Sequence, residues 1–115
     1  MFGIKEISSV ELAGLLEKGE KLRLVDVRSA AELQQGIIAG AEFVPMHLIP
    51  LKAKEFEADD KVIFYCRSGA RSGQVCAFLQ QRGMDNVYNL AHGVIGWAQA
   101  GQDFVTPSAD MLAIG

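Results

Sequence analysis

A single cysteine stands where several effects that favour an anionic sulfur coincide. Cys66 directly follows an apolar run, and residues 67–72 contain two arginines and a glycine before a helical pattern begins. A helix N-terminus has unpaired backbone N–H groups and a partial positive charge, and a glycine lets the loop before it curl so that amides point inward. These features predict a Cys66 pKa below the ordinary value of about 8.5, and therefore a thiolate nucleophile.

The alternative is that Cys66 is a small buried core residue, which is the usual role of a cysteine at the end of a strand. Arg67 and Arg71 would then be ordinary surface charges. Two of the five arginines of the chain lie in this short loop, which favours an anion-binding interpretation. The candidate binding loop after Cys66 consists of Arg67, Ser68, Gly69, Ala70, Arg71 and Ser72.

The elements that position this loop alternate between short β-type runs and helical segments. Residues 62–65 are β-branched or aromatic throughout, which is typical of a central strand of a parallel sheet, buried on both faces. The other predicted strands are 4–7, 21–27, 42–44 and 86–90. The alternation predicts an α/β fold, with a mostly parallel five-stranded sheet and helices on both faces. Sites in such sheets lie at the carboxyl ends of strands, just after Asp26 and Tyr65.

Helix starts are marked by two capping boxes, Ser8 with Glu11 and Ser29 with Glu32. The remaining predicted helical segments are 47–56, about 72–82 and 93–101. The tail (102–115) has a small apolar end that docks either on the domain or on a partner, and the sequence leaves this choice open.

Length and composition narrow the class of protein. At 115 residues and 50% hydrophobic content, we expect a single domain, 1–115, with a core over about 4–101. A net charge of −3 argues against a nucleic-acid partner. Two cysteines and two histidines without a CxxC motif argue against a metal site. The sequence has neither a secretory signal pattern nor an apolar run of about 18 residues, so we expect no membrane contact and a cytoplasmic location.

Three segments resemble, in the same order, the signatures of single-domain rhodaneses, which are sulfurtransferases of the rhodanese homology family. They are LVDVRSAAELQQGIIAGAEFVP (24–45), IFYCRSGARS (63–72) and NLAHGVIGWAQAG (89–101). The resemblance covers nearly the whole chain. Two positions depart from the family pattern: Ile37 stands where histidine is usual, and His92 stands where a glycine pair is usual. The first departure removes a side chain that in relatives mostly supports the fold, and it does not touch the cysteine loop.

The resemblance implies a three-layer rhodanese-like fold and a sulfurtransferase that needs no cofactor. Cys66 would take the outer sulfur of a small anionic donor such as thiosulfate and carry it as a persulfide, held by the loop amides and by Arg67 and Arg71. Cyanide in an assay, or a thiol or sulfur-carrier protein in the cell, would then accept the sulfur, with ping-pong kinetics. Asp26 and Arg28 would be structural and fix the loop through polar contacts. The alternative is a protein-to-protein sulfur-relay module with little thiosulfate activity.

Other interpretations of the cysteines are less consistent with the spacing. Cysteine phosphatases and arsenate reductases need Cys-x5-Arg, whereas four residues separate Cys66 from Arg71. Asp26 would have to act as the general acid in that reaction. An inactive scaffold is disfavoured because Cys66 and its loop are intact. Cys76 is either a resolving thiol or a small core residue, and the second is the commoner role.

Overall fold

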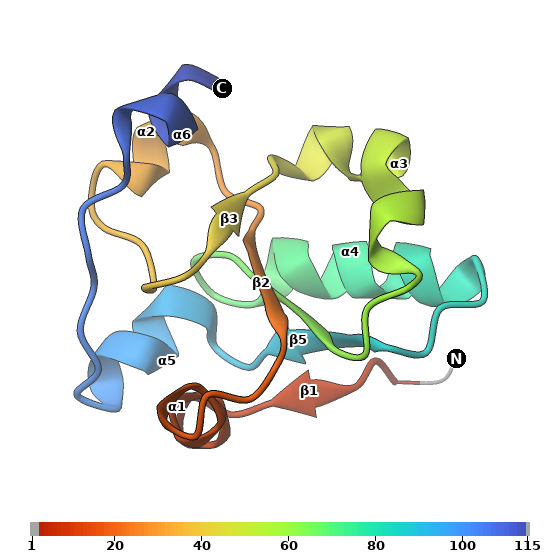
Figure 1. Ribbon diagram of the computed structural model, residues 1–115, viewed down its shortest axis with the longest axis horizontal. Coiled ribbons are helices and arrows are strands. Elements are labelled where there is room, and N and C mark those ends of the chain that lie inside the picture. Colours follow the sequence, from red (N-terminus) through yellow and green to blue (C-terminus); the bar gives the residue numbers. More distant parts are fainter. Residues whose placement is uncertain (1–2, 115) are drawn as a thin grey trace.

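The computed structural model describes residues 3–114, with only the backbone of Ile114. Its sheet contains five strands, all parallel, in the order β1-β5-β4-β2-β3 (Figure 1). The strands are β1 (Glu6–Ile7), β2 (Arg23–Asp26), β3 (Glu42–Phe43), β4 (Val62–Tyr65) and β5 (Val87–Leu90). The predicted five-stranded sheet is confirmed, and β4 is its middle strand.

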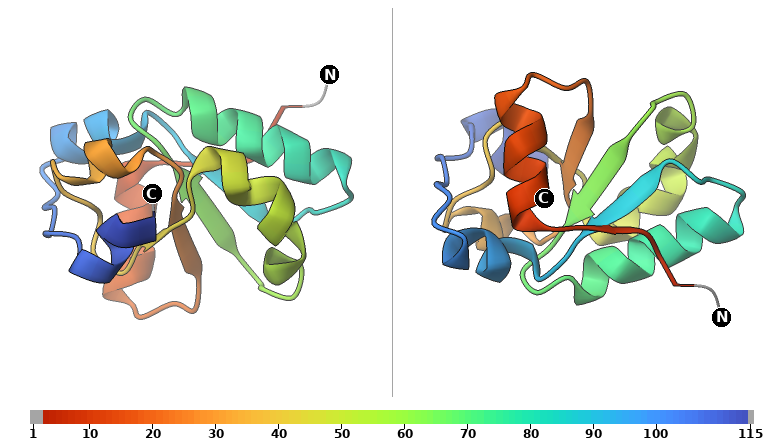
Figure 2. Two further views of the ribbon diagram at one scale, coloured as in Figure 1. Left: turned by 90° about the horizontal axis from the view of Figure 1, so that it is seen from above. Right: turned by 90° about the horizontal axis from the view of Figure 1, so that it is seen from below.

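Helices cover both faces of the sheet, which confirms the predicted layers. The helices are α1 (Ser9–Glu17), α2 (Ala30–Leu33), α3 (Ile49–Lys52), α4 (Ala70–Gln81), α5 (Gly93–Gln99) and α6 (Ala109–Ile114). Two 3-10 turns, η1 (Met46–Leu48) and η2 (Ala53–Phe56), flank α3. Helices α1 and α5 pack on one face of the sheet, and α3 and α4 pack on the other (Figure 2). None of the helices within residues 3–114 is both long enough and apolar enough to cross a membrane.

Strand β4 is buried on both faces of the sheet, which is why its run of residues contains no charged side chain. Its side chains alternate, so that Val62 and Phe64 join the core beneath α3 and α4, whereas Ile63 and Tyr65 join the core beneath α1 and α5. All four residues are fully buried. Each such side chain contributes about 1.5–3 kcal/mol when it leaves water, so β4 anchors both halves of the core. Cys66 is the next residue, so its backbone is held in place by this buried strand.

Local signals in the sequence set the starts of α1 and α2. Both capping boxes are present: the Glu11 N–H donates to Ser8 Oγ at 3.0 Å, and the Ser29 N–H donates to Glu32 Oε1 at 3.1 Å. The start of α4 differs from the prediction of about residue 72. Helix α4 begins at Ala70 because Gly69, at φ 100°, forms its N-cap. The last three loop residues, Ala70, Arg71 and Ser72, therefore belong to the first helical turn.

The tail docks on the domain, which answers the question that the sequence left open. Val105 and Ile37 exchange backbone hydrogen bonds of 2.8 and 2.9 Å in an antiparallel bridge. Met111 and Leu112 of α6 then pack on an apolar cluster that includes Ile37 and Phe43. Figure 1 shows the tail running from α5 along the left-hand edge of the molecule to α6, which lies beside α2. Ile37, one of the two departures from the family pattern, is thus part of the surface that receives the tail.

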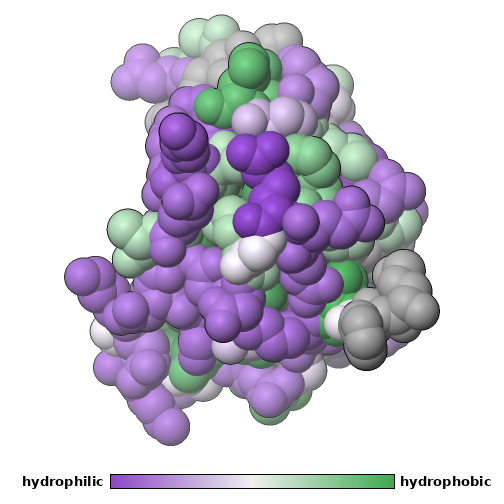
Figure 3. Space-filling view, turned by 90° about the vertical axis from the view of Figure 1, so that its right-hand side faces the viewer, coloured by the Kyte–Doolittle hydropathy of each residue, from purple (hydrophilic) through white to green (hydrophobic). Residues whose placement is uncertain are grey.

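The end of the sheet where the strands begin differs from the end where they finish. Hydrophilic side chains predominate at the end where the strands begin (Figure 3). Here Arg23 donates to Glu42 at 2.7 Å and to Asp59 at 3.1 Å, and its guanidinium lies over the Phe56 ring. The positive charge of Arg23 is therefore compensated within the fold. The cysteine loop lies at the opposite end.

Candidate active site

The topology places Cys66 at the carboxyl end of the central strand. Cys66 directly follows β4 and precedes α4, so the chain turns sharply over residues 66–69. The neighbouring strands β2 and β5 are parallel to β4 and end at the same edge. This is the edge at which parallel sheets place functional residues.

Three donors surround the sulfur of Cys66. The Gly69 N–H lies 3.1 Å from Sγ, the Ser72 hydroxyl 3.3 Å and the Ser72 N–H 3.5 Å. Cys66 is only 1% exposed, and the Ser72 side chain is fully buried. The sulfur thus lies in a small, largely desolvated cradle of hydrogen-bond donors, which is the environment expected for a stabilised thiolate.

The same contacts determine the acidity of Cys66. Burial raises the pKa of its thiol, but hydrogen bonds from the Ser72 hydroxyl and from the N–H groups of Ser72, Gly69 and Ser68 outweigh burial and lower the pKa below its ordinary value. This is the direction expected from the sequence. The donors are mainly backbone groups and one serine, whereas the sequence analysis also relied on the arginine charges.

Helix α5 fixes the cysteine loop by donating hydrogen bonds to its carbonyls, a role that the sequence patterns did not predict. The Val94 N–H donates to the Cys66 carbonyl at 3.0 Å, and the Ile95 N–H donates to the Arg67 carbonyl at 3.1 Å. Gly93 permits this approach, because a Cβ at that position would lie 2.3 Å from the Cys66 carbonyl oxygen. With their carbonyls turned toward α5, the peptides of the loop are fixed in orientation. The glycine at the start of a short helical pattern was the available signal.

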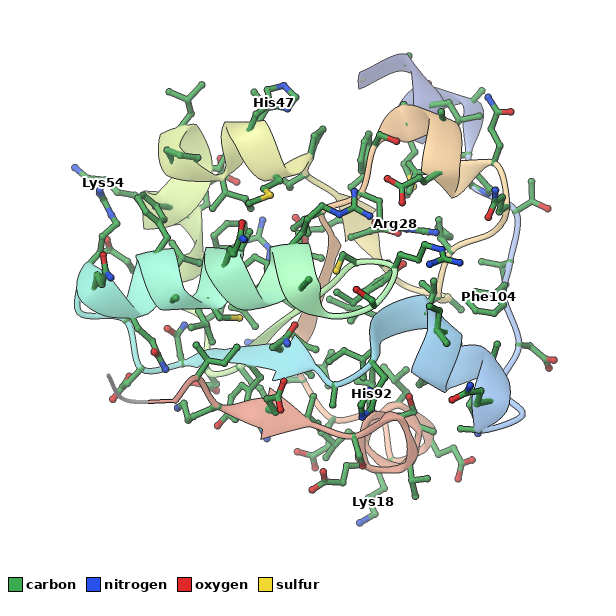
Figure 4. All side chains as sticks on the ribbon, turned by 180° about the vertical axis from the view of Figure 1, so that it is seen from behind. Lys18, Arg28, His47, Lys54, His92 and Phe104 are labelled. Atoms are coloured by element: carbon green, nitrogen blue, oxygen red, sulfur yellow. The ribbon has the colours of Figure 1, made fainter. Side chains whose placement is uncertain are left out.

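His92 and Gly93 both adopt left-handed backbone conformations at the start of α5. His92 has φ 65° and Gly93 has φ 53°, and within residues 3–114 His92 is the only non-glycine residue with positive φ. A residue with a Cβ is strained in this region, which explains why a glycine pair suits the two positions. His92 is exposed and lies beside α1, so its ring is not part of the sulfur cradle (Figure 4).

The two loop arginines have different surroundings. Arg71 forms a bidentate pair with Glu32, with both N–O distances at 2.7 Å. Glu32 also caps α2, and the guanidinium of Arg71 holds the pKa of this carboxyl at about 2. Arg67 is exposed and has no ion-pair partner among residues 3–114. Arg67 therefore carries the uncompensated positive charge of the loop, and Arg71 shares its charge with a carboxylate.

Asp26 and Arg28 form a buried ion pair next to the site. Arg28 Nη2 lies 2.7 Å from Asp26 Oδ2, and the same nitrogen donates to the Gly36 carbonyl at 2.8 Å. Both side chains are at most 3% exposed. The hydrogen bonds of the pair brace the turn after β2 and reach the chain beyond α2 at Gly36, and none within residues 3–114 goes to the cysteine loop. Removal of one partner would leave a buried charge, at a cost of about 3–5 kcal/mol.

A groove of about 520 Å³ opens beside the loop. Its walls come from the ends of β2 and β3, the start of α2 and Arg71, and Figure 4 labels two of its residues, Arg28 and His47. The lining residues are Val27, Arg28, Ser29, Ala30, Pro45, Met46, His47 and Arg71. Within the described part of the chain, no cluster of three or more metal-ligating side chains is present. The groove borders the cysteine loop at Arg71, and Cys66 itself is not among its lining residues.

Comparisons with known proteins agree with this arrangement. The family model of the rhodanese-like domain matches residues 8–100. A sulfurtransferase of Allochromatium vinosum is 47% identical over 104 residues, which cover 90% of this chain and 97% of that protein. A rhodanese-related protein of Thermoplasma volcanium superposes with a TM-score of 0.79 and 28% identity, covering 90% of this chain and 99% of the other. A thiosulfate sulfurtransferase of Pseudomonas aeruginosa gives the same two values over 94% of this chain and 23% of its own. The chain belongs to the rhodanese-like domain family.

Proposed function

We propose that the chain is a sulfurtransferase that carries a sulfane sulfur as a persulfide on Cys66. Family membership and the similar sulfurtransferase support a role in sulfur transfer. The persulfide on Cys66 is supported by the set of donors around Sγ, two N–H groups and one hydroxyl within 3.5 Å. Such donors favour a thiolate before the reaction and an anionic sulfur during it.

In the first half-reaction, the Cys66 thiolate attacks the outer sulfur of thiosulfate. A bond forms between Sγ and that sulfur, the S–S bond of thiosulfate breaks, and sulfite leaves with the electron pair. The negative charge then resides on the outer sulfur of the persulfide. The loop amides face this region and are preorganised to stabilise the charge.

In the second half-reaction, an acceptor attacks the outer sulfur. With cyanide, a C–S bond forms, the persulfide S–S bond breaks, and thiocyanate leaves while Cys66 returns to the thiolate. A thiol acceptor would become a persulfide in the same way. The covalent intermediate separates the two steps, which gives ping-pong kinetics.

The charged residues around the loop serve capture and position. Arg67 is exposed, and its charge attracts a dianionic donor. Arg71 lines the groove and shares its charge with Glu32, so its contribution to donor binding is smaller than that of a free arginine. Asp26 and Arg28 support the adjacent turn. The acceptor is a thiol, either small or on a sulfur-carrier protein, that approaches through the groove beside the loop.

The test is to incubate the chain with thiosulfate, remove the donor and measure the intact mass. The proposal predicts a gain of one sulfur atom that is lost on addition of cyanide, with release of thiocyanate. Cys66→Ser is the control and should gain nothing. Transfer rates to cyanide, to small thiols and to a sulfur-carrier protein then define the acceptor. If the native chain gains no sulfur from thiosulfate or from a persulfide donor, the proposed function is wrong.

A further inference from the structure

Asn89, a buried residue of β5, connects three parts of the molecule around the cysteine loop. Its Nδ2 donates to Glu6 Oε2 at 3.0 Å and to the Gly69 carbonyl at 3.2 Å, and its Oδ1 lies 2.5 Å from the Ser72 hydroxyl. A carboxylate and a carbonyl only accept hydrogen bonds, so they fix the orientation of the amide. Asn89 therefore presents only an acceptor to Ser72.

The Ser72 hydroxyl has two acceptors and one proton. Asn89 Oδ1 lies on one side at 2.5 Å and Cys66 Sγ on the other at 3.3 Å. Ser72 is fully buried and Asn89 is 2% exposed. The hydroxyl can donate to only one of these acceptors at a time, so the sulfur and the amide compete for its proton.

The protonation state of Cys66 decides which acceptor receives the proton. When Cys66 is a thiol, its S–H donates to Ser72 Oγ, and the Ser72 hydroxyl donates to Asn89. When the thiol has lost its proton to solvent, the sulfur is only an acceptor, and the Ser72 hydroxyl turns toward it. The oxygen lone pairs of Ser72 and Asn89 then face each other at short distance, which opposes the thiolate.

We infer that Asn89 is a positioning residue that controls, through the single proton of Ser72, how readily Cys66 becomes a thiolate. The role of Asn89 in the persulfide state rests on the proposed function. In that state the charge has moved to the outer sulfur, and Sγ is neutral. The Ser72 hydroxyl then returns to Asn89, and the loop amides alone face the charged outer sulfur. Asn89 thus opposes the thiolate and favours the states in which Sγ is neutral.

Other charged groups near the sulfur are separate from this switch. Arg71 interacts electrostatically with Cys66, Arg67 is adjacent in the chain, and Asp26 lies at the end of β2. Glu6 lies beyond Asn89, and His92 is exposed at the start of α5. None of these charged residues is replaced in the variants below. Asn89→Leu does remove the hydrogen bond to Glu6, but it does so in both backgrounds, so this loss cancels in the coupling between the two substitutions.

The experiment is a double-mutant cycle on the pKa of Cys66, without any sulfur donor. The rate of alkylation by iodoacetamide is measured across pH by intact mass in the native chain, Ser72→Ala, Asn89→Leu and the double variant. Burial raises the pKa of Cys76 to about 12, so Cys76 does not titrate in the same range. A hydrogen bond to a charged group corresponds to about one pKa unit. Ser72→Ala should raise the pKa of Cys66 by about that amount, and Asn89→Leu should lower it.

The double variant decides whether Asn89 acts through Ser72. The inference predicts that Asn89→Leu has no effect on the pKa of Cys66 once Ser72 is alanine. An equal shift in both backgrounds, or no shift in the native background, would overturn it. Asn89→Ala repeats the cycle if Asn89→Leu does not fold, with thermal unfolding as the check. Because the titration uses no donor, a failed cycle in a chain that still forms the persulfide removes only the role of Asn89.

Discussion

The two cysteines of the chain have nearly the same burial and opposite acidity. Cys66 is 1% exposed and Cys76 is fully buried, and both belong to the core cluster beneath α3 and α4. Burial raises the pKa of both thiols, to about 12 for Cys76, where the charge of Glu6 adds to the effect. For Cys66 the hydrogen bonds from Ser72, Gly69 and Ser68 reverse the shift.

The difference between the two regions lies in free hydrogen-bond donors. Cys76 lies inside α4, where backbone N–H groups are already used by the helix, and no hydrogen bond to its sulfur is present within residues 3–114. Cys66 lies before the helix, where the N–H groups of the first turn have no partner in the helix. In this chain the position before α4 supplies the donors that lower the pKa of Cys66, whereas burial without such donors raises the pKa of Cys76.

The largest effect should come from exchanging the two sulfurs for oxygen. Cys66→Ser should abolish sulfur transfer, because no persulfide can form. Cys76→Ser should keep transfer and lose about 1–3 kcal/mol of folding free energy, since it puts a hydroxyl in an apolar core. Thiocyanate formation and urea unfolding measure the two effects. If the folded Cys76→Ser variant lost transfer, Cys76 would be a resolving thiol, and the contrast between the cysteines would be wrong.

The next largest effect tests whether α5 maintains the cradle of Cys66. In Gly93→Ala the new Cβ would lie 2.3 Å from the Cys66 carbonyl oxygen, so the loop must move. We expect transfer to fall by at least about tenfold, as for one lost donor, and the pKa of Cys66 to rise. Gly101→Ala is the matched control, because Gly101 has φ 78° with open space around it and carries only the backbone strain. Equal transfer in the two variants would show that α5 does not hold the loop.

A smaller effect concerns the positive charge of Arg71 near Cys66, whereas the charge that acts on Cys76 is that of the Glu6 carboxylate. Arg71→Ala should raise the apparent KM for thiosulfate by less than about tenfold and change kcat little, because Arg71 already pairs with Glu32. Glu32→Gln should lower the apparent KM for thiosulfate, since it frees the Arg71 guanidinium. Glutamine at this position retains the helix cap. Steady-state kinetics with thiosulfate measure both. An unchanged kcat/KM in Arg71→Ala would refute a role in capturing the donor.

The last comparison concerns the contribution of each thiol to the pH dependence of stability. The folded state keeps Cys76 protonated up to a pKa of about 12, so the unfolded state loses its proton first, and stability falls as pH rises above the ordinary value of about 8.5. By about pH 10 the loss is about 2 kcal/mol, and Cys76→Ala should remove it in urea unfolding.

Cys66 should show the opposite sign in the same unfolding experiment. Its folded pKa is lowered, so its contribution to stability grows as pH rises toward about 8.5 and is lost as pH falls through the folded pKa. Cys66→Ser should remove this gain. The comparison fails if both variants change the pH profile in the same direction.

The sequence alone identifies the features that depend on neighbouring residues. Both capping boxes, the fully apolar β4 and the cysteine followed by a glycine and a helix are local patterns, and all are present in the structure. The sequence predicts the start of α4 at about residue 72, whereas the helix begins at Ala70. The difference arises because a left-handed Gly69 can cap a helix without a polar side chain.

Features that depend on distant residues could not be predicted in this way. The pairing of Arg71 with Glu32, the contact of Asn89 with Ser72 and the docking of the tail at Ile37 join segments separated by 39, 17 and 68 positions. No periodic pattern reports such contacts, because they depend on how the strands are ordered in the sheet. The cysteine and the loop that supplies its hydrogen-bond donors were therefore predictable, and the distant contacts that position this loop were not.

The most direct test is the ultraviolet absorbance of the thiolate as a function of pH, taken as the difference between the native chain and Cys66→Ser. We expect Cys66 to be half ionised clearly below the ordinary cysteine value of about 8.5, while Cys76 stays protonated. A midpoint at or above about 8.5 would contradict the claim that the start of α4 makes Cys66 a stabilised thiolate.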